Sequence, residues 1–193
     1  SGPWVDRAAV APILHAASGF DTVVGTSQGK MPQRPPNWEI MVADILTGAY
    51  AFGAVQTALL GRERFGRGEH VDVSMMEAMM TLIPAHIQAA QSAEPLPIGR
   101  FHPVRTKDGY AMVTPVSNKN FESLCALLQR PELRSDPRFI FGERTRHFKE
   151  LAEEIEKWSI SLTTQECDEA LNDAGVPCSA YTQLEDLFDH PQV

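Results

Sequence analysis

The longest hydrophobic stretch of this chain lies between residues 38 and 64. In its sequence, WEIMVADILTGAYAFGAVQTALLGRER, apolar side chains occupy nearly every face of a helix instead of one. A helix that is apolar all round is normally a buried helix. The stretch ends within the segment RERFGRG, residues 62–68. Its basic side chains suit the negative end of a helix dipole, and Gly66 and Gly68 supply a stop. The pattern therefore predicts a long buried helix.

The residues before this helix carry weaker patterns. The apolar segment AAVAPILHAAS, residues 8–18, is broken by Pro12. Residues 20–25, FDTVVG, favour a β-strand because they are rich in β-branched and aromatic side chains. The next segment, TSQGKMPQRPPN at residues 26–37, is dense in glycine, proline and polar residues, which indicates a loop with no room for a helix.

The residues after the long helix predict a strand and a second helix. Residues 70–74, HVDVS, alternate between polar and apolar side chains, as a short strand does. Ser74 then serves as the expected N-cap of a helix over residues 75–91, with Glu77 completing a capping box. The first part of the chain is therefore expected to be mostly helical.

The composition changes after a predicted linker at residues 93–99. Residues 101–116 predict a β-hairpin, because a Lys-Asp-Gly turn separates two apolar runs. Three amphipathic helical patterns follow, then a short extended piece and a last helical turn. In order, these segments are residues 118–130, 143–162, 163–175, 176–182 and 184–188. This order predicts a small α+β domain over residues 100–193.

Composition and charge exclude several classes of protein. The chain has 193 residues, 43% of them hydrophobic and 22% charged, which is ordinary for a globular protein. The net charge of −8 argues against a dedicated nucleic-acid-binding protein. No apolar run reaches membrane-spanning length on this reading, because Asp44 and Gln56 interrupt the longest one. We therefore expect no nucleic acid and no membrane among its partners.

Neither the cysteines nor the histidines form the pattern of a metal site. The three cysteines are widely separated and fit neither a disulfide framework nor a zinc ligand set, as expected of reduced thiols in a cytoplasmic protein. No histidine has a carboxylate partner at metal-site spacing, so each is expected to be a surface or interface residue. The histidines are His15, His70, His86, His102, His147 and His190. No metal is expected.

One short motif points to a serine hydrolase. Residues 25–29, GTSQG, match the G-x-S-x-G nucleophile elbow, in which Ser27 would stand on a turn between a strand and a helix. The sequence that follows, KMPQRPP, cannot form that helix. A plain loop is therefore the favoured interpretation.

The lone carboxylate of the long helix, Asp44, is the strongest candidate for chemistry. One interpretation is structural, since aspartate is favoured at a helix N-terminus, where free N–H groups stabilise its charge. The other is an ionised, partly desolvated carboxylate aimed at an electrophile, as covalent catalysis by aspartate requires. Gly48, one turn further on, would let a ligand approach the helix closely. The residue pattern leaves both interpretations open.

The segment VADILTGAYAFGAVQTALLGRERFGRGEHVDVSMMEAMM, residues 42–80, closely resembles the central segment of the class III CoA-transferases. This family includes formyl-CoA and carnitine CoA-transferases and α-methylacyl-CoA racemase. The shared pattern is an aspartate in a Thr/Gly-rich helix, an R-x-G-x-G turn and a V-D-V-S segment before a helix. GPWVDR, RTKDGYAMV, DAGVPCSAYT and DHPQV extend the resemblance over essentially the whole chain.

The resemblance implies a fold and an assembly. Family members are about twice as long, so residues 1–92 would belong to a large α/β, Rossmann-like domain whose N-terminal nucleotide-fold half is missing here. Residues 93–99 would be a linker and residues 100–193 the small α+β domain. Members of the family form interlocked homodimers, in which each chain threads the other.

The resemblance also implies an activity, the transfer of CoA between an acyl-CoA thioester and a carboxylic acid. Asp44 falls at the position of the family's nucleophile, which forms aspartyl-anhydride and aspartyl-CoA intermediates. CoA would be the substrate and carrier, with no tightly bound cofactor. Residues 97–101, PIGRF, lie where transferases carry a glycine-rich loop that folds over the intermediates. Gly99 and Arg100, together with Gly48, are therefore candidate substrate-binding residues.

Two alternatives remain. The racemase branch of the family uses a histidine that would align near Val10 and a glutamate that would align near Ser117, and this chain has neither. The transferases' own Tyr-Asp pair at the first position is replaced by Val10 and Ala11, which weakens assignment to a particular substrate. The second alternative is a non-catalytic paralogue, since a fold does not guarantee a function.

Overall fold

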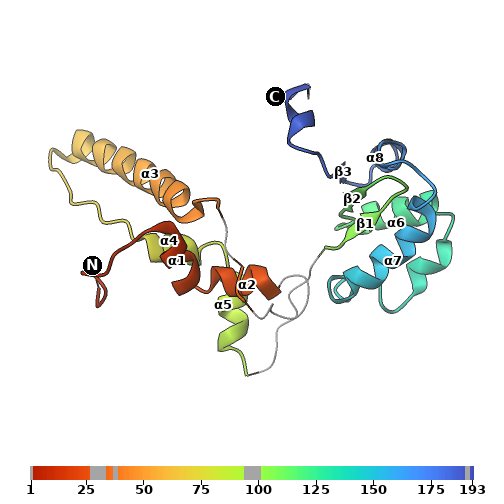
Figure 1. Cartoon of the computed structure of the whole chain (residues 1–193), viewed down its shortest axis with the longest axis horizontal. Coiled ribbons are helices and arrows are strands. Elements are labelled where there is room, and N and C mark those ends of the chain that lie inside the picture. Colours follow the sequence, from red (N-terminus) through yellow and green to blue (C-terminus); the bar gives the residue numbers. More distant parts are fainter. Residues whose placement is uncertain (1, 27–33, 37–38, 94–100, 190–191) are drawn as a thin grey trace. The chain divides into compact units, whose positions relative to one another are not determined.

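The computed structural model describes residues 2–26, 34–36, 39–93, 101–189 and 192–193. The chain divides into two compact units, Ser1–Leu96 and Pro97–Val193 (Figure 1). Helices and strands are both present, which agrees with the mixed fold expected from the sequence. Most of the predicted linker lies outside the described residues, so the assignment of its bounds and of the two domains stays a prediction.

The first unit contains five helices among the residues described in it. In Figure 1, α1 and α4 lie beside the long helix α3, and both pack against it. The described part of this unit contains no strand, so the Rossmann-like layering expected for residues 1–92 stays a prediction. Its helices are α1 (Ala11–Ala17), α2 (Phe20–Thr26), α3 (Val42–Phe65), α4 (Met75–Met80) and α5 (Pro84–Gln91).

Two strand predictions in the first unit are wrong. Residues 20–25 form α2 instead, which follows a left-handed Gly19 with φ of 82°, and Val23 N–H donates to the Gly19 carbonyl at 3.0 Å. Residues 70–74 lie outside any helix or strand. A strand needs a neighbour for its backbone groups, and the described part of this unit offers none. The side chains favour a strand, but without a neighbouring strand to pair with, these residues do not form one.

The effects of Pro12 and Pro84 on the helices also differ from the expectation. Pro12 does not break the first segment, because it occupies the first turn of α1, where its missing N–H costs no helical hydrogen bond. Pro84, in contrast, interrupts a segment that was expected to be one helix. It divides the predicted helix over residues 75–91 into α4 and α5, since a helix usually ends before the residue that precedes a proline.

Helix α3 begins at Val42, contains Asp44 in its first turn and ends at Phe65. Gly66 closes it with φ of 70° and donates its N–H to the Arg62 carbonyl at 2.8 Å. The predicted helix and its glycine stop are therefore confirmed. The predicted burial is wrong for this chain by itself, because of the α3 side chains only Ala43 is fully buried. Large apolar side chains of α3 are exposed, namely Ile45, Tyr50, Phe52, Val55, Leu59, Leu60 and Phe65.

By length and composition, α3 passes the test for a helix that could cross a membrane. It has 24 residues, so the expectation that no apolar run reaches spanning length is wrong on these two criteria. The core helix of a protein that acts in water passes the same test. The exposed apolar surface of α3 therefore needs a covering.

The second unit contains a three-stranded antiparallel sheet in the order β1-β2-β3. Arg105 pairs with Tyr110 across the hairpin, which confirms the hairpin predicted around the Lys-Asp-Gly turn. The strands are β1 (Pro103–Arg105), β2 (Tyr110–Val113) and β3 (Cys178–Ala180), and β3 pairs with β2. The three predicted amphipathic helices are present as α6 (Asn118–Leu127), α7 (Phe148–Ser159) and α8 (Thr164–Asp173), with short 3-10 helices η1 (Pro131–Ser135), η2 (Arg144–His147) and η3 (Glu185–Asp189).

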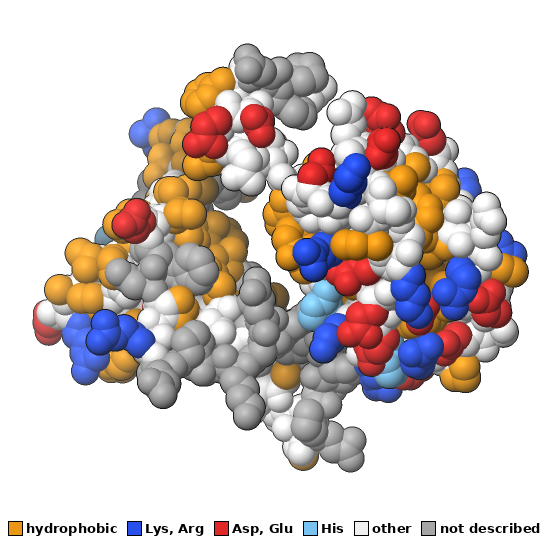
Figure 2. All heavy atoms as spheres, turned by 45° about the vertical axis from the view of Figure 1, so that its right-hand side comes forward, with side chains coloured by type: hydrophobic (Ala, Val, Ile, Leu, Met, Phe, Trp, Pro, Cys, Tyr) orange, Lys and Arg blue, Asp and Glu red, His pale blue; other side chains and the backbone are white. Residues whose placement is uncertain are grey.

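One hydrophobic core holds this second unit together. It is formed by side chains from the sheet, from all three helices and from the segments between them, including Val104, Ala111, Val113, Phe121, Leu124, Phe139, Leu151, Ile155, Leu171 and Val176. Figure 2 shows acidic and basic side chains interleaved on the visible face of this unit, while hydrophobic side chains gather on the visible face of the first unit. All three cysteines lie in the second unit as free thiols, Cys125, Cys167 and Cys178.

The hairpin turn is tied to the start of α8. The Asp108 carboxylate accepts hydrogen bonds from Thr164 N–H at 2.7 Å and from Thr164 Oγ1 at 2.8 Å. These two bonds hold the pKa of Asp108 below its ordinary value. A Cβ at Gly109 would stand only 3.0 Å from Thr164 Oγ1, so the turn approaches the helix closely. The ionised aspartate thus joins the sheet to α8.

We expect Asp108→Ala to destabilise the second unit at neutral pH. Because the folded-state pKa of Asp108 is lowered, its contribution is present above the ordinary pKa and is lost as pH falls through the folded-state value. Urea denaturation followed by circular dichroism should therefore show a gap between the two proteins at pH 7 that closes in acid. Asp173→Ala, at the other end of α8, is the matched control and should not reduce stability. A gap that persists unchanged in acid would contradict this account.

Candidate active site

Asp44 is the third residue of α3 and its side chain is exposed. The N-cap of this helix is Met41, whose side chain makes no capping hydrogen bond. Asp44 is therefore not the capping residue, although it lies where the helix dipole favours a negative charge. The expected partial desolvation is absent in this chain by itself, because none of the described elements covers the carboxylate.

The first turn of α3 is held by a side chain from another helix. His15 of α1 accepts a hydrogen bond through Nε2 from the backbone N–H of Ala43, at 3.2 Å. His15 is only 1% exposed, and its ring lies 5.7 Å from the ring of Phe20. The expectation that His15 is a surface or interface residue is therefore wrong. The spacing of Ala11, Leu14 and His15 on one face of α1 was the signal that could have revealed it.

A small apolar core lies beneath this turn. Ala11 and Leu14 of α1, Ala43 of α3 and Met79 of α4 form one buried cluster. Further along α3, the Tyr50 hydroxyl donates to Thr81 Oγ1 at 3.1 Å, and the Thr81 hydroxyl donates to the Ala78 carbonyl. These contacts connect the first half of α3 to α1 and to the end of α4. Asp44 therefore projects from the first turn of α3 directly after Ala43, which is completely buried.

Gly48 lies one turn after Asp44 and is exposed. A Cβ built at this position would meet no atom of the chain within 4 Å. No packing contact among the described residues therefore requires glycine here. The surface of α3 next to Asp44 is bare backbone, which leaves room for a ligand to approach the helix.

Other predicted site residues lie outside the described residues. These are Gly99 and Arg100, so the structure gives them no position relative to Asp44. Ser27 also lies outside them. The element that precedes it is the helix α2, whereas a nucleophile elbow requires a strand, and this argues against the hydrolase interpretation.

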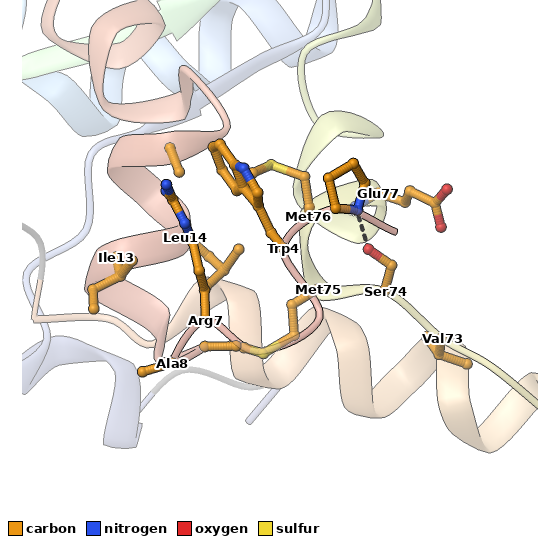
Figure 3. Close-up of a pocket in the computed structure, with 13 residues that line it drawn as sticks. Trp4, Arg7, Ala8, Ile13, Leu14, Val73, Ser74, Met75, Met76 and Glu77 are labelled. Carbon is orange, nitrogen blue, oxygen red and sulfur yellow. Dashed lines mark hydrogen bonds between the residues drawn. The ribbon is translucent and has the colours of Figure 1, made fainter. Parts of the chain in front are cut away.

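The first unit also contains an open pocket of about 620 Å³ (Figure 3). Its walls come from the segment before α1, from α1 itself and from the start of α4, and they are mostly apolar. The Arg7 guanidinium lies 4.1 Å from the centre of the Trp4 ring, and Ser74 Oγ accepts the Glu77 N–H at 3.3 Å on the opposite wall. Neither Asp44 nor Gly48 lines this pocket. It is therefore distinct from the surface around the candidate nucleophile.

Comparisons with known proteins give a consistent result. The family model described as "CoA-transferase family III" matches residues 1–193. A succinate–glutarate CoA-transferase of Agrobacterium fabrum is 26% identical over 203 residues, which cover 100% of this chain and 50% of that protein. An acyl-CoA transferase of Fusarium pseudograminearum is 30% identical over 202 residues, which cover 100% of this chain and 43% of that protein.

A solved structure agrees with these matches. The hypothetical protein Rv3272 of Mycobacterium tuberculosis superimposes with a TM-score of 0.81 at 27% identity. The superposition covers 100% of this chain and 52% of the other. The chain therefore spans about half the length of the relatives that it matches.

Proposed function

The chain belongs to CoA-transferase family III, and on this basis we propose that the complete protein transfers CoA from an acyl-CoA thioester to a carboxylic acid. The observation that carries the proposal is Asp44, an exposed carboxylate in the first turn of α3 on a buried, hydrogen-bonded support. Relatives that match the whole chain are named as CoA-transferases, which supports the same class of reaction. We propose that the complete protein has a further half, because those relatives are about twice as long.

In the proposed first half-reaction, the Asp44 carboxylate attacks the carbonyl carbon of the acyl-CoA. The carbon–sulfur bond breaks, CoA leaves as a thiolate, and a mixed anhydride remains on Asp44. The thiolate then attacks the Asp44 carbonyl carbon. This step releases the donor acid as a carboxylate, which carries away one Asp44 oxygen, and leaves an aspartyl-CoA thioester. The division of one exchange into acyl-transfer steps is what a covalent nucleophile contributes.

In the second half-reaction, the acceptor carboxylate attacks the aspartyl-CoA thioester. CoA leaves again as a thiolate, and a second mixed anhydride forms between Asp44 and the acceptor. The thiolate attacks the acceptor's carbonyl carbon, which yields the new acyl-CoA and restores the Asp44 carboxylate. No metal, oxidant or proton donor is required by this balance. The open surface at Gly48 would admit the thioester beside the nucleophile.

We propose that protein, not lipid, covers the apolar surface of α3. The exposed apolar side chains extend along the helix, and a charged residue such as Asp44 within a membrane-spanning segment would be costly. The remaining half of the protein and a second copy of it, in a homodimer, are the proposed coverings. We also propose a cytoplasmic location, which the three free thiols support.

Replacement of the candidate nucleophile tests the function. We expect Asp44→Asn in the complete protein to lower transfer of CoA from succinyl-CoA to glutarate by roughly 10³-fold or more, because an amide is not an effective nucleophile. CoA binding, measured by calorimetry, should be retained. Glu39→Gln removes a neighbouring exposed carboxylate outside α3 and should leave the rate unchanged. Transfer by Asp44→Asn at the wild-type rate would refute the proposal.

The 193 residues by themselves are expected to bind CoA weakly and to show negligible transfer. CoA carries several negative charges, whereas this sequence has a net charge of −8 and no G-x-G-x-x-G segment. Arg62 and Arg64 lie in the last turn of α3, at the negative end of its dipole, and Arg67 follows it. Without CoA held against it, Asp44 loses an orientation effect that can be worth ~7–11 kcal/mol of barrier.

Calorimetry with CoA checks this expectation directly. The isolated chain should give no micromolar binding, and activity should return only when the remaining half is supplied. Micromolar binding of CoA to the isolated chain would show that the phosphate contacts lie within these residues, contrary to the account.

A further inference from the structure

The start of α3 is capped in an unusual way. A helix leaves its first N–H groups without partners inside the helix, and an N-cap side chain normally bonds the second or third of them. Here the N-cap is Met41, which makes no such bond, and Val42 N–H donates to the Ile40 carbonyl at 2.9 Å. The second helical residue, Ala43, donates its N–H to His15 Nε2 instead. A side chain from 28 positions earlier thus takes the place of the missing cap.

This bond lies in a buried environment. Ala43 is 0% exposed and His15 is 1% exposed, so water does not compete for either group. An N–H buried without a partner is costly, so the loss of this hydrogen bond would favour a different position of the turn. Because Nε2 accepts this hydrogen bond, the imidazole must be neutral, with its proton on Nδ1. His15 therefore acts here as an acceptor, not as a charged group.

The next residue after the bonded Ala43 is Asp44. The Ala43 N–H lies in the peptide unit before the Ala43 Cα, and the next planar unit carries the Asp44 Cα. Both units belong to the first turn of α3, so a shift of the Ala43 N–H displaces the base of the Asp44 side chain together with that turn. The other support of this turn is the apolar contact of Ala43 with Leu14 and Met79, which is not directional. The hydrogen bond that His15 Nε2 accepts from the Ala43 N–H is, among the described residues, a directional contact between α1 and this turn. No contact between His15 and the Asp44 carboxylate is present, so any influence must pass through the backbone.

From this geometry we infer that His15 is a positioning residue for the Asp44 nucleophile, acting through the Ala43 N–H at the first turn of α3. The inference rests on the proposed CoA transfer. It adds a residue of α1 to those that position the nucleophile on α3. A displacement of a reacting group by about 1 Å can reduce a rate by about 10²-fold. The loss of His15 should therefore appear in kcat, while the binding of CoA, which does not depend on this bond, should remain.

The test compares two substitutions at His15 in the complete protein. His15→Leu introduces an apolar side chain of similar size that has no acceptor. His15→Gln restores an acceptor, because its side-chain amide oxygen can accept the Ala43 N–H. We expect His15→Leu to lower kcat for CoA transfer roughly 10–100-fold with little change in KM. His15→Gln should recover most of the rate. Leu14→Val, which weakens packing from the same helix without touching a hydrogen bond, is the matched control for stability.

Backbone hydrogen exchange provides a readout that does not depend on activity. The Ala43 amide should exchange faster in His15→Leu than in wild type, and should stay protected in His15→Gln and in Leu14→Val. This measurement remains informative if His15→Leu is less stable, because Leu14→Val reports what reduced stability alone does to the same amide.

The outcomes separate this inference from the proposed function. If wild type transfers CoA and Asp44→Asn does not, the function stands; equal kcat values for His15→Leu and wild type would then overturn the inference alone. Equal losses in His15→Leu and His15→Gln would overturn it too, since the acceptor would not matter. If wild type shows no transfer, the proposed function fails, and unchanged Ala43 exchange in His15→Leu would show independently that the positioning contact is absent.

Discussion

The burial of Ala43 between α1 and α4 is the constraint on which the candidate site depends. Ala43 has no exposed surface, and the adjacent Asp44 is exposed. Because these two neighbouring residues differ in this way, the backbone that carries the carboxylate is held in place while a ligand can reach the carboxylate itself. His15 adds direction to the contact, and the bare backbone at Gly48 keeps the neighbouring surface open. A nucleophile needs this combination, because its rate depends on orientation as well as on access.

Local signals in the sequence were sufficient to predict much of the fold. Helix α3 with its stop at Gly66, the hairpin around Asp108 and the three amphipathic helices of the second unit all follow from patterns within a few turns of chain. The N-cap at Ser74 is an example, since its side chain accepts the Glu77 N–H within one turn. Asp44 was also located correctly in a first turn, because charge preference at a helix start is a local effect.

The expectations that failed depend on partners distant in sequence. Residues 20–25 and 70–74 have strand-like patterns, but no neighbouring strand in the described part of their unit pairs with them. The apolar pattern of α3 predicted a buried helix, yet these residues alone do not supply its covering. The spacing on α1 could have indicated that His15 is buried, but not its role, because its partner is a backbone N–H 28 positions away and side-chain spacing does not report backbone partners.

The central claim, that Asp44 passes through covalent anhydride and thioester intermediates, is tested most directly by isotope transfer. In that mechanism Asp44 loses one oxygen to the donor acid and gains one from the acceptor in each turnover. The complete protein should therefore be incubated with an acyl-CoA and an acceptor carboxylate labelled with heavy oxygen, and its peptides analysed by fragmentation mass spectrometry. The account predicts the label on Asp44 and none on Glu39, which lies five positions earlier in the same tryptic peptide. Turnover with an unlabelled Asp44 would contradict it.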